Sequence, residues 1–239
     1  IDSLINPNLE IKCNKALGRD ITIESLFADG YKAILLAIGS YKSIKLGLPD
    51  EDVAGVIPAM KFLKSFNLKN KSLAKGRVGV IGGGNSAMDA ARVAIRQKGV
   101  DSVTVFYRRT KAEMPAHEQE IGAEIDEGIK LRTLMSPVKI LHKDGKLTGV
   151  RFIRNELGEP DASGRRKPVP IPGSEVDVPL DTLIVAISEQ PYTRGIQSLN
   201  RTKWGTISVN EETLATSQPG VFAAGDVVTG PATIIDALA

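Results

Sequence analysis

The sequence has very few of the residues that build disulfide frameworks and metal sites. Its 239 residues include one cysteine, Cys13, and two histidines, His117 and His142. A single cysteine excludes an intrachain disulfide, a Cys-x-x-Cys redox pair and a cysteine cluster within this chain. The two histidines lie far apart and lack the spacing of metal ligands, so no metal site is predicted. A lone cysteine also fits a reducing compartment, and we expect a cytoplasmic protein.

Long apolar runs and a strong net charge are missing as well. No stretch approaches the roughly 18 apolar residues that a membrane-spanning helix needs. The net charge is only +3, and the short basic clusters at residues 108–109 and 165–167 are not interleaved with aromatic residues, so nucleic-acid binding is not predicted. With 42% hydrophobic and 25% charged residues, the chain can bury one large core or two modest ones.

One stretch has a clear chemical pattern, residues 77–109, RVGVIGGGNSAMDAARVAIRQKGVDSVTVFYRR. A short apolar run predicts a strand that ends at three consecutive glycines. Asn85 and Ser86 are then expected to cap a helix that continues to Gly99. Alternation at residues 103–107 predicts a second strand. The order strand, glycine turn, helix, strand is the context in which a glycine motif becomes informative.

The spacing of the turn is Gly82-x-Gly84-x-x-Ala87. Gly82 allows a tight turn, Gly84 lets the backbone approach a pyrophosphate, and Ala87 keeps the helix close to the strand. The amides at the helix start are then available to phosphate oxygens. The sequence therefore predicts a dinucleotide site, and the alternative is a tight strand-to-helix turn without a ligand.

The residues after the second strand favour NADP(H) over NAD(H). An NAD site usually has an Asp or Glu here for the ribose 2′-hydroxyl, whereas an NADP site has arginine for the 2′-phosphate. This chain has Arg108 and Arg109, and arginine can bind a phosphate through two parallel hydrogen bonds. The alternative is a solvated basic turn.

Patterns elsewhere predict a few further elements. We expect a helix over 58–66, buried strands over 31–40 and 181–188, and a hairpin over 137–154 that turns at Asp144-Gly145. A helix is expected over 115–127, with its glutamates on a solvated face, and a long polar loop over 155–172. Parallel strands predict helices on both faces of the sheet.

Three motifs together resemble the pyridine nucleotide–flavin oxidoreductases, and specifically the glutamate synthase small-subunit family. They are VIGGGNSAMDAARVAIRQKG with YRRTKAEMPA, then DTLIVAISEQP, then GVFAAGDVVTGPATIIDALA. The resemblance covers nearly the whole chain. It implies that NADPH reduces FAD by hydride transfer and that iron–sulfur clusters or a partner subunit accept the electrons. No side chain is implied as a catalytic acid or base, because the cofactors supply the chemistry.

The resemblance also implies which residues bind each cofactor. The pyrophosphate of NADPH would contact the glycine turn and the start of its helix, and the 2′-phosphate would contact the two arginines. The FAD site would include Gly225 and Asp226, and Thr233 and Ile234 would lie near the isoalloxazine ring at the start of the last helix. The residues implied for NADPH are Gly82, Gly84, Asn85, Ser86, Ala87, Arg108 and Arg109.

The chain also departs from this family, because no earlier glycine motif for FAD and no cysteine-rich domain precedes residues 1–40. We expect a fragment of the α/β class, with a Rossmann-like NADP(H)-binding domain over 72–185 inserted in a partial FAD-domain-like lobe. That lobe would comprise 1–71, including a linker, and 186–239. Such a fragment would bind NADPH but hold FAD weakly or not at all, and it would be inactive alone. The alternative function is a non-catalytic NADP(H)-binding or sensing module.

Overall fold

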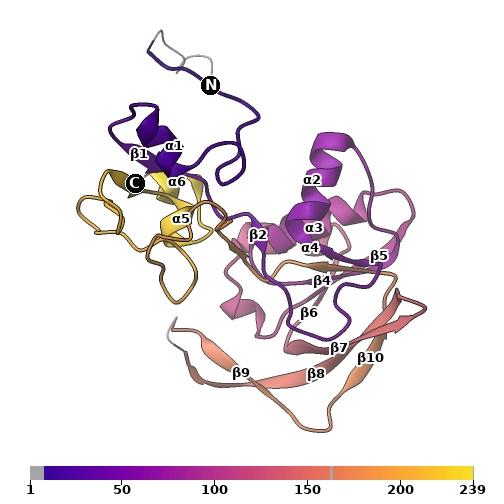
Figure 1. The fold of residues 1–239 in the computed structure, drawn as a ribbon. Coiled ribbons are helices and arrows are strands. Elements are labelled where there is room, and N and C mark those ends of the chain that lie inside the picture. The colour runs from indigo at the N-terminus through magenta and orange to yellow at the C-terminus, as the bar shows by residue number, and fades with distance from the viewer. Residues whose placement is uncertain (1–7, 162–163, 239) are drawn as a thin grey trace. The chain divides into compact units, whose positions relative to one another are not determined.

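The computed structural model describes residues 8–161 and 164–238, and the chain forms two compact units (Figure 1). The larger unit comprises residues 43–188, and the smaller unit combines the segments on either side, within 1–42 and 189–239. One α/β unit is therefore inserted in the chain of another. The predicted boundaries at 71/72 and 185/186 differ from these limits. The predicted boundaries are those of cofactor-binding domains, whereas the two units are defined by their internal contacts. The boundaries therefore stay a prediction.

A five-stranded parallel sheet forms the centre of the larger unit, which confirms the predicted α/β class. The strand order is β3-β11-β4-β5-β6, and all four neighbouring pairs are parallel. Because β4 and β11 lie in the interior of this sheet, their apolar residues are buried on both faces. The strands are β3 (Val56–Pro58), β4 (Gly76–Ile81), β5 (Val100–Phe106), β6 (Lys130–Arg132) and β11 (Thr182–Val185).

Helices cover one face of this sheet (Figure 1). The layer contains α2 (Ala59–Lys69), α3 (Asn85–Ile95) and α4 (Glu118–Asp126), with a 3₁₀ turn, η2 (Lys111–Glu113), before α4. Val78 and Val80 of β4 point into this layer, where α3 presents a row of buried alanines. Small side chains allow α3 to lie close to the strands, which holds its N-terminus against the end of β4.

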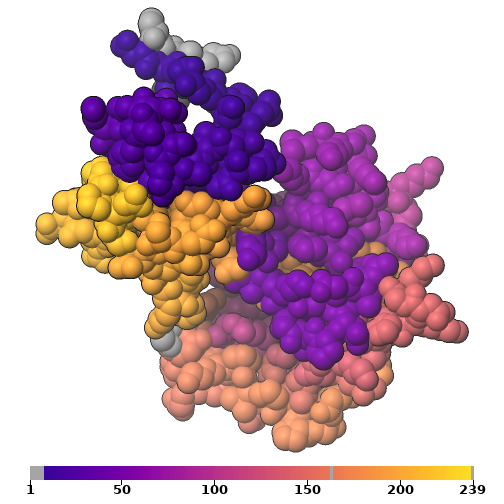
Figure 2. Space-filling view, in the orientation of Figure 1, coloured from indigo at the N-terminus to yellow at the C-terminus, as the bar shows by residue number. Residues whose placement is uncertain are grey.

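An antiparallel sheet, not a second helix layer, covers the opposite face, so the prediction of helices on both faces is wrong. Its strands are β7 (Met135–Lys143), β8 (Lys146–Pro160), β9 (Arg166–Pro170) and β10 (Val176–Pro179), in the order β10-β8-β7 with β9 pairing β8. Phe106 of the parallel sheet stacks on Phe152 of β8 with ring centroids 4.2 Å apart. Figure 2 shows these strands, salmon to orange, at the surface of the larger unit.

The predicted hairpin over 137–154 is confirmed, whereas the predicted loop over 155–172 is wrong. β7 and β8 pair through a turn in which Asp144 and Gly145 have φ of 51° and 70°. β8 then continues far past the hairpin and pairs antiparallel with β9. We call this outer pair, residues 155–160 and 166–170, the β8–β9 arm. Neither face of this pair packs in a core, so its sequence is polar and proline-rich and lacks the apolar alternation that predicts a strand.

The smaller unit has a core of its own around a parallel pair of strands. β1 (Ile34–Leu36) pairs with β13 (Val221–Ala223). Its buried side chains include Ile23, Ile207 and Val227. The other elements are α1 (Ile23–Ala28), α5 (Asp226–Thr229) and α6 (Ile234–Leu238), and the short strands β2 (Lys42–Ser43) and β12 (Glu189–Gln190) pair with each other.

Candidate functional site

The glycine turn joins β4 to α3, and packing explains its first two glycines. Gly82 has φ of 153°, and a Cβ there would lie 2.2 Å from the carbonyl oxygen of Ala186. A Cβ on Gly83 would lie 2.5 Å from the ring of Tyr107. Any larger residue at either position would displace a neighbouring strand or the tyrosine. These two glycines are therefore required by the fold itself.

Gly84 differs from them, because nothing in the fold requires a glycine there. Its φ of −96° and ψ of 175° suit any residue. A Cβ would meet no described atom nearer than Pro115 Cγ, at 3.8 Å. Gly84 is the N-cap of α3 and no side chain caps this helix. The turn thus leaves bare backbone and first-turn amides at the start of an 11-residue helix, which suits an anion.

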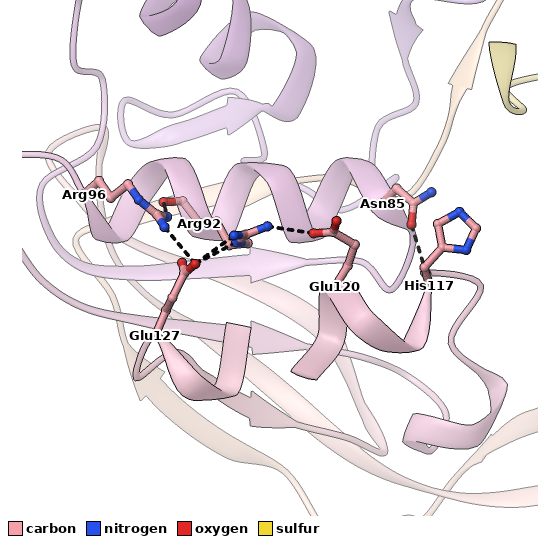
Figure 3. Close-up of polar contacts among 6 residues, drawn as sticks. All are labelled: Asn85, Arg92, Arg96, His117, Glu120 and Glu127. Atoms are coloured by element: carbon pink, nitrogen blue, oxygen red, sulfur yellow. Dashed lines mark hydrogen bonds and ion pairs between the residues drawn. The ribbon is translucent and has the colours of Figure 1, made fainter. Parts of the chain in front are cut away.

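Asn85 and Ser86 do not cap α3 as predicted, because the helix begins at Asn85 itself. The Asn85 Oδ1 instead accepts a hydrogen bond of 3.1 Å from the His117 amide (Figure 3). The Ala116 amide donates to the Gly83 carbonyl at 3.0 Å. These two bonds hold the segment before α4 beside the glycine turn. Ala87, fully buried, packs α3 against the sheet as predicted.

Tyr107 connects the turn to the segment that follows β5. Its ring lies against Gly83, and its hydroxyl donates to the Glu113 carbonyl at 2.8 Å. The Tyr107 amide donates to Arg132 of β6 at 3.0 Å. The ring, hydroxyl and amide of Tyr107 are thus all used in positioning this segment. The sequence pattern predicts Tyr107 only as a strand residue, and no motif indicates its contact with Gly83.

The two arginines have different environments. Arg108 is exposed overall, but the surrounding protein partly desolvates its guanidinium. This desolvation, together with the neighbouring charges of Arg109 and Arg165, lowers the pKa of Arg108. Arg109 is only 2% exposed. Its Nη2 forms an ion pair of 2.6 Å with Asp161, and its Nε donates to the Arg166 carbonyl at 2.6 Å. Of these two arginines, Arg108 is therefore the one at the surface.

Charged residues tie α4 to α3, so the prediction of a solvated glutamate face is wrong for part of α4. Arg92 binds Glu120 at 2.7 Å and Glu127 at 2.8 Å, and Arg96 binds Glu127 at 2.7 Å (Figure 3). Hydrogen bonds from Arg96 and Arg92 lower the pKa of Glu127 to about 2. These ion pairs keep the start of α4, and with it His117, in register with α3.

Glu124 is the most buried acidic residue of α4, at 1% exposed, and its Oε1 has no hydrogen-bond partner among the described residues. Burial raises its pKa to about 8, although Arg92 acts in the opposite direction. The side chain is therefore held as a neutral carboxyl near neutral pH. The helical spacing of the glutamates could not distinguish it from its exposed neighbours.

A second group of candidate residues lies in the smaller unit. Gly225 has φ of 70° and ψ of −154°, a conformation that favours glycine. The Oδ1 of Asp226 is buried and has no partner among the described residues, while the Asp226 carbonyl accepts from Ser40 Oγ at 2.7 Å. A buried carboxylate oxygen without a donor is an unsatisfied acceptor, which suits a ligand hydroxyl.

Thr233 and Ile234 lie at the start of α6, as predicted. Thr233 and Asp236 exchange hydrogen bonds in a capping box, with the Thr233 hydroxyl donating to Asp236 Oδ2 at 2.6 Å. Ile234 is 81% exposed. The hydroxyl of Thr233 is therefore used within the helix, and Ile234 presents apolar surface.

The described ranges 8–161 and 164–238 lack two other features. They contain no group of three or more His, Cys, Asp or Glu residues arranged to hold a metal ion. No helix in them has the length and apolar character needed to cross a membrane.

The sequence profile described as "Pyridine nucleotide-disulphide oxidoreductase" matches residues 8–239. The chain belongs to this family. Members of the pyridine nucleotide-disulphide oxidoreductase family bind NADP(H) and FAD, the two cofactors that the motifs implied. The chain is 41% identical over 243 residues to the NADP(+)-dependent formate dehydrogenase subunit beta of Moorella thermoacetica. It is 36% identical over 250 residues to the glutamate synthase [NADPH] small chain of Escherichia coli, which confirms the predicted resemblance.

Solved structures of two reductases have a similar fold. Mycobacterium tuberculosis FprA in complex with NADPH matches 93% of this chain and 63% of its own, with a TM-score of 0.77 at 22% identity. Thioredoxin reductase of Lactococcus lactis matches 87% of this chain and 61% of its own, with a TM-score of 0.65 at 23% identity. At 22% and 23% identity, these two matches show a likeness of fold.

The chain is shorter than its curated relatives. The matches cover 100% of it but 34% of the formate dehydrogenase subunit, and 97% of it but 52% of the glutamate synthase small chain. The activity, substrates and partners of the whole protein are therefore matters for proposal.

Proposed function

We propose that this chain is the NADPH-binding part of a flavin-dependent oxidoreductase. When bound, the two cofactors supply the redox chemistry, in which hydride passes from NADPH to FAD. The observation that carries the proposal is Gly84, a glycine that the fold does not need, at the uncapped start of a helix. A ligand that approaches the backbone closely gives this position a reason to lack a side chain, in addition to the general preference for glycine over alanine at an N-cap.

Residues of the larger unit bind NADPH and do no acid–base chemistry. The amides at the start of α3 bind the pyrophosphate, assisted by the helix dipole. The side chain of Asn85 holds His117 and leaves its backbone to the ligand. Arg108 binds the 2′-phosphate, because its guanidinium is at the surface while that of Arg109 is paired with Asp161.

Residues of the smaller unit fit part of an FAD site. The unpartnered Oδ1 of Asp226 accepts a hydrogen bond from a hydroxyl of the flavin's sugar-alcohol chain, and Gly225 provides the backbone conformation that places it. Ile234 offers exposed apolar surface near the end of the same unit. The 1–71 and 186–239 segments then contribute to the flavin domain, and 72–185 to the NADP(H) domain.

The electron acceptor is a partner subunit or an iron–sulfur domain of the same protein. This part of the proposal is supported by the relatives, which are named as subunits or chains of larger enzymes. Examples are the NADP(+)-dependent formate dehydrogenase subunit beta and the NADPH-Fe(3+) oxidoreductase subunit beta of Geobacter sulfurreducens. We place the activity in the protein that contains this chain, in the cytoplasm.

Isothermal titration of the chain with NADPH and with NADH tests the binding proposal. We expect NADPH to bind at one site per chain and NADH at least about tenfold more weakly, the usual worth of a charge-assisted contact to phosphate. Arg108→Gln should remove most of this difference. Equal affinities for the two nucleotides, or no binding of either, would overturn the proposal.

A further inference from the structure

We propose that His117 binds the dinucleotide through its imidazole, which donates a hydrogen bond to the pyrophosphate at the start of α3. The inference rests on the proposed function and extends it to a residue 32 positions after Asn85, outside the glycine motif. It adds a side chain to the backbone amides that hold the part of the ligand common to NADPH and NADH.

Backbone contacts hold residue 117 beside the start of α3. The His117 amide donates to Oδ1 of Asn85, the first residue of α3, at 3.1 Å. The preceding residue, Ala116, is 7% exposed, and its amide donates to the Gly83 carbonyl at 3.0 Å. Gly83 and Asn85 flank Gly84 in the sequence. The two bonds therefore fix the backbone of residue 117 against the glycine turn on either side of the position that the fold leaves open.

The His117 side chain, in contrast, has no structural task. The residue is exposed, and its ring forms no hydrogen bond or ion pair with any residue that the structure describes. Figure 3 shows the ring next to the Asn85 side chain, at the end of the ribbon where α3 begins. An imidazole carries at least one N–H. A donor that the protein does not use is thus placed at the anion-binding end of α3.

The position of His117 in α4 does not explain why this residue is a histidine. His117 is the N-cap of α4, where the side chain of Ser, Thr, Asp or Asn stabilises a helix by accepting from an amide of the first turn. The His117 side chain makes no such bond. The contact with Asn85 uses only its amide, which any residue except proline provides. A contact with a ligand would account for the histidine.

The charges around His117 permit an anion. The first turn of α4 contains Glu118 and Glu120. Glu120 forms an ion pair of 2.7 Å with Arg92, and Figure 3 shows its carboxylate directed toward Arg92 and away from His117. Glu118 is exposed, so solvent and salt screen its charge. The uncapped start of α3 favours a negative group, which can accept from its amides and from the ring together.

The position of His117 favours the pyrophosphate over the 2′-phosphate. His117 is bonded to the first residue of α3, whereas Arg108, the residue proposed for the 2′-phosphate, follows β5. The pyrophosphate is common to NADPH and NADH. His117 should therefore strengthen the binding of both nucleotides by the same factor, and the preference for NADPH should depend on Arg108. This signature separates the two roles.

The first test observes the ring directly. The chain has two histidines, His117 and His142, so nuclear magnetic resonance of the chain with labelled imidazoles gives two sets of ring signals. His142 is an exposed residue of β7 whose ring lies 3.5 Å from Asp50. We expect NADPH and NADH each to shift the His117 signals and to leave the His142 signals in place. His117 signals that saturating NADPH does not move would overturn the inference.

The second test uses isothermal titration of three variants with NADPH and with NADH. His117→Ser should weaken the binding of both nucleotides about tenfold, as loss of one charge-assisted hydrogen bond does. The temperature of unfolding should not fall, because a serine can cap α4, whereas a purely structural role would lower binding and stability together. His117→Gln keeps an N–H donor and should stay within about threefold of the original affinity. His142→Ser is the matched control and should change either affinity by less than about twofold.

The failure of this inference differs from the failure of the proposed function. A His117→Ser variant that binds both nucleotides as tightly as the original, while Arg108→Gln loses the preference for NADPH, would overturn the inference alone. Loss of that preference in His117→Ser, with NADH binding unchanged, would also overturn it, because the ring would then contact the 2′-phosphate. An unaltered chain that binds neither nucleotide would overturn both.

Discussion

Gly84 is the residue on which the binding proposal depends most directly. Its backbone angles suit any amino acid and its Cβ position is open. Gly84→Ala should therefore leave the free energy of unfolding within about 0.5 kcal/mol of its original value. The added methyl group stands where a pyrophosphate approaches, and NADPH binding should weaken at least about tenfold. Urea unfolding and isothermal titration measure the two effects.

Two other glycines provide the controls for this variant. Gly122→Ala lies in α4 with no atom within 4 Å of the new methyl group, so neither stability nor binding should fall. Gly83→Ala forces a methyl group into the Tyr107 ring and should lower stability by about 1–3 kcal/mol, as overpacking does. A Gly84→Ala protein that binds NADPH as tightly as the original would contradict the account.

Glu124 gives the chain a predictable dependence on pH. Its folded-state pKa of about 8 lies above the ordinary value of 4.5, so the folded state holds an extra proton between these pH values. The stabilisation that this proton gives the folded state is complete below the ordinary pKa of 4.5. It is lost as the pH rises through the folded-state pKa of about 8. Within this window the slope is at most about 1.4 kcal/mol per pH unit. Arg92, Glu120 and Glu127 are the charged groups that act on it.

Glu124→Gln should remove this dependence, because an amide does not titrate. The stability of the original chain should fall relative to the variant by about 1–3 kcal/mol between roughly pH 5.5 and pH 8. Urea unfolding at several pH values measures it, with the exposed Glu118→Gln as control. Parallel pH profiles for Glu124→Gln and the original chain would contradict the assignment.

The sequence predicted residue types at the site better than residue roles. Gly82 and Gly84 are in the turn as predicted, because their spacing is set by local geometry. Arg109 and Asn155 could not be placed in the same way, since their partners lie in strands distant in sequence. A short motif encodes contacts within a strand–helix unit, whereas burial of a guanidinium depends on how separate sheets pack.

The pairing of α3 with α4 belongs to the scale of secondary-structure elements. Arg92 is 31% and Glu127 23% exposed, so their ion pair is only partly screened. A double-mutant cycle with Arg92→Gln and Glu127→Gln should give a measurable favourable coupling energy in the free energy of unfolding. A cycle between Arg77 and Asp181, which are 47% and 39% exposed, should give a smaller coupling energy.

The Arg92–Glu127 pair also bears on binding, because α4 positions His117 beside the glycine turn. Either single variant should weaken NADPH binding only slightly, by about twofold to threefold, since no charge of the ligand is contacted. A coupling energy near zero would mean that α4 is held by its apolar contacts alone.

Elements with strong local patterns were predicted correctly, and those with weak patterns were not. The helix predicted over 58–66 is present as α2, and the hairpin around Asp144-Gly145 is present as β7–β8. The continuation of β8 past Asn155 was not predicted, because this segment is rich in polar residues and proline and lacks an alternation of apolar and polar residues. The covering of the second sheet face by strands was missed because a parallel βαβ pattern ordinarily implies helices there.

At the scale of the whole molecule, the chain is one α/β unit inserted in another, and the two candidate sites divide between them. The glycine turn lies in residues 43–188, and the Asp226 segment lies in the unit that flanks it. The order of motifs along the sequence predicts such an insertion, because the nucleotide motif falls between two segments that resemble parts of a flavin domain. The predicted weak binding of FAD by this chain alone stays a prediction.

The most direct test of the account is rapid mixing of the FAD-loaded protein that contains this chain with NADPH or NADH in the absence of oxygen. The account predicts that NADPH bleaches the flavin absorbance and that NADH does so at least about tenfold more slowly at equal subsaturating concentration. It also predicts that Arg108→Gln removes most of this difference. Flavin that stays oxidised with NADPH, as in a sensing module, or that is reduced equally by both nucleotides, would contradict it.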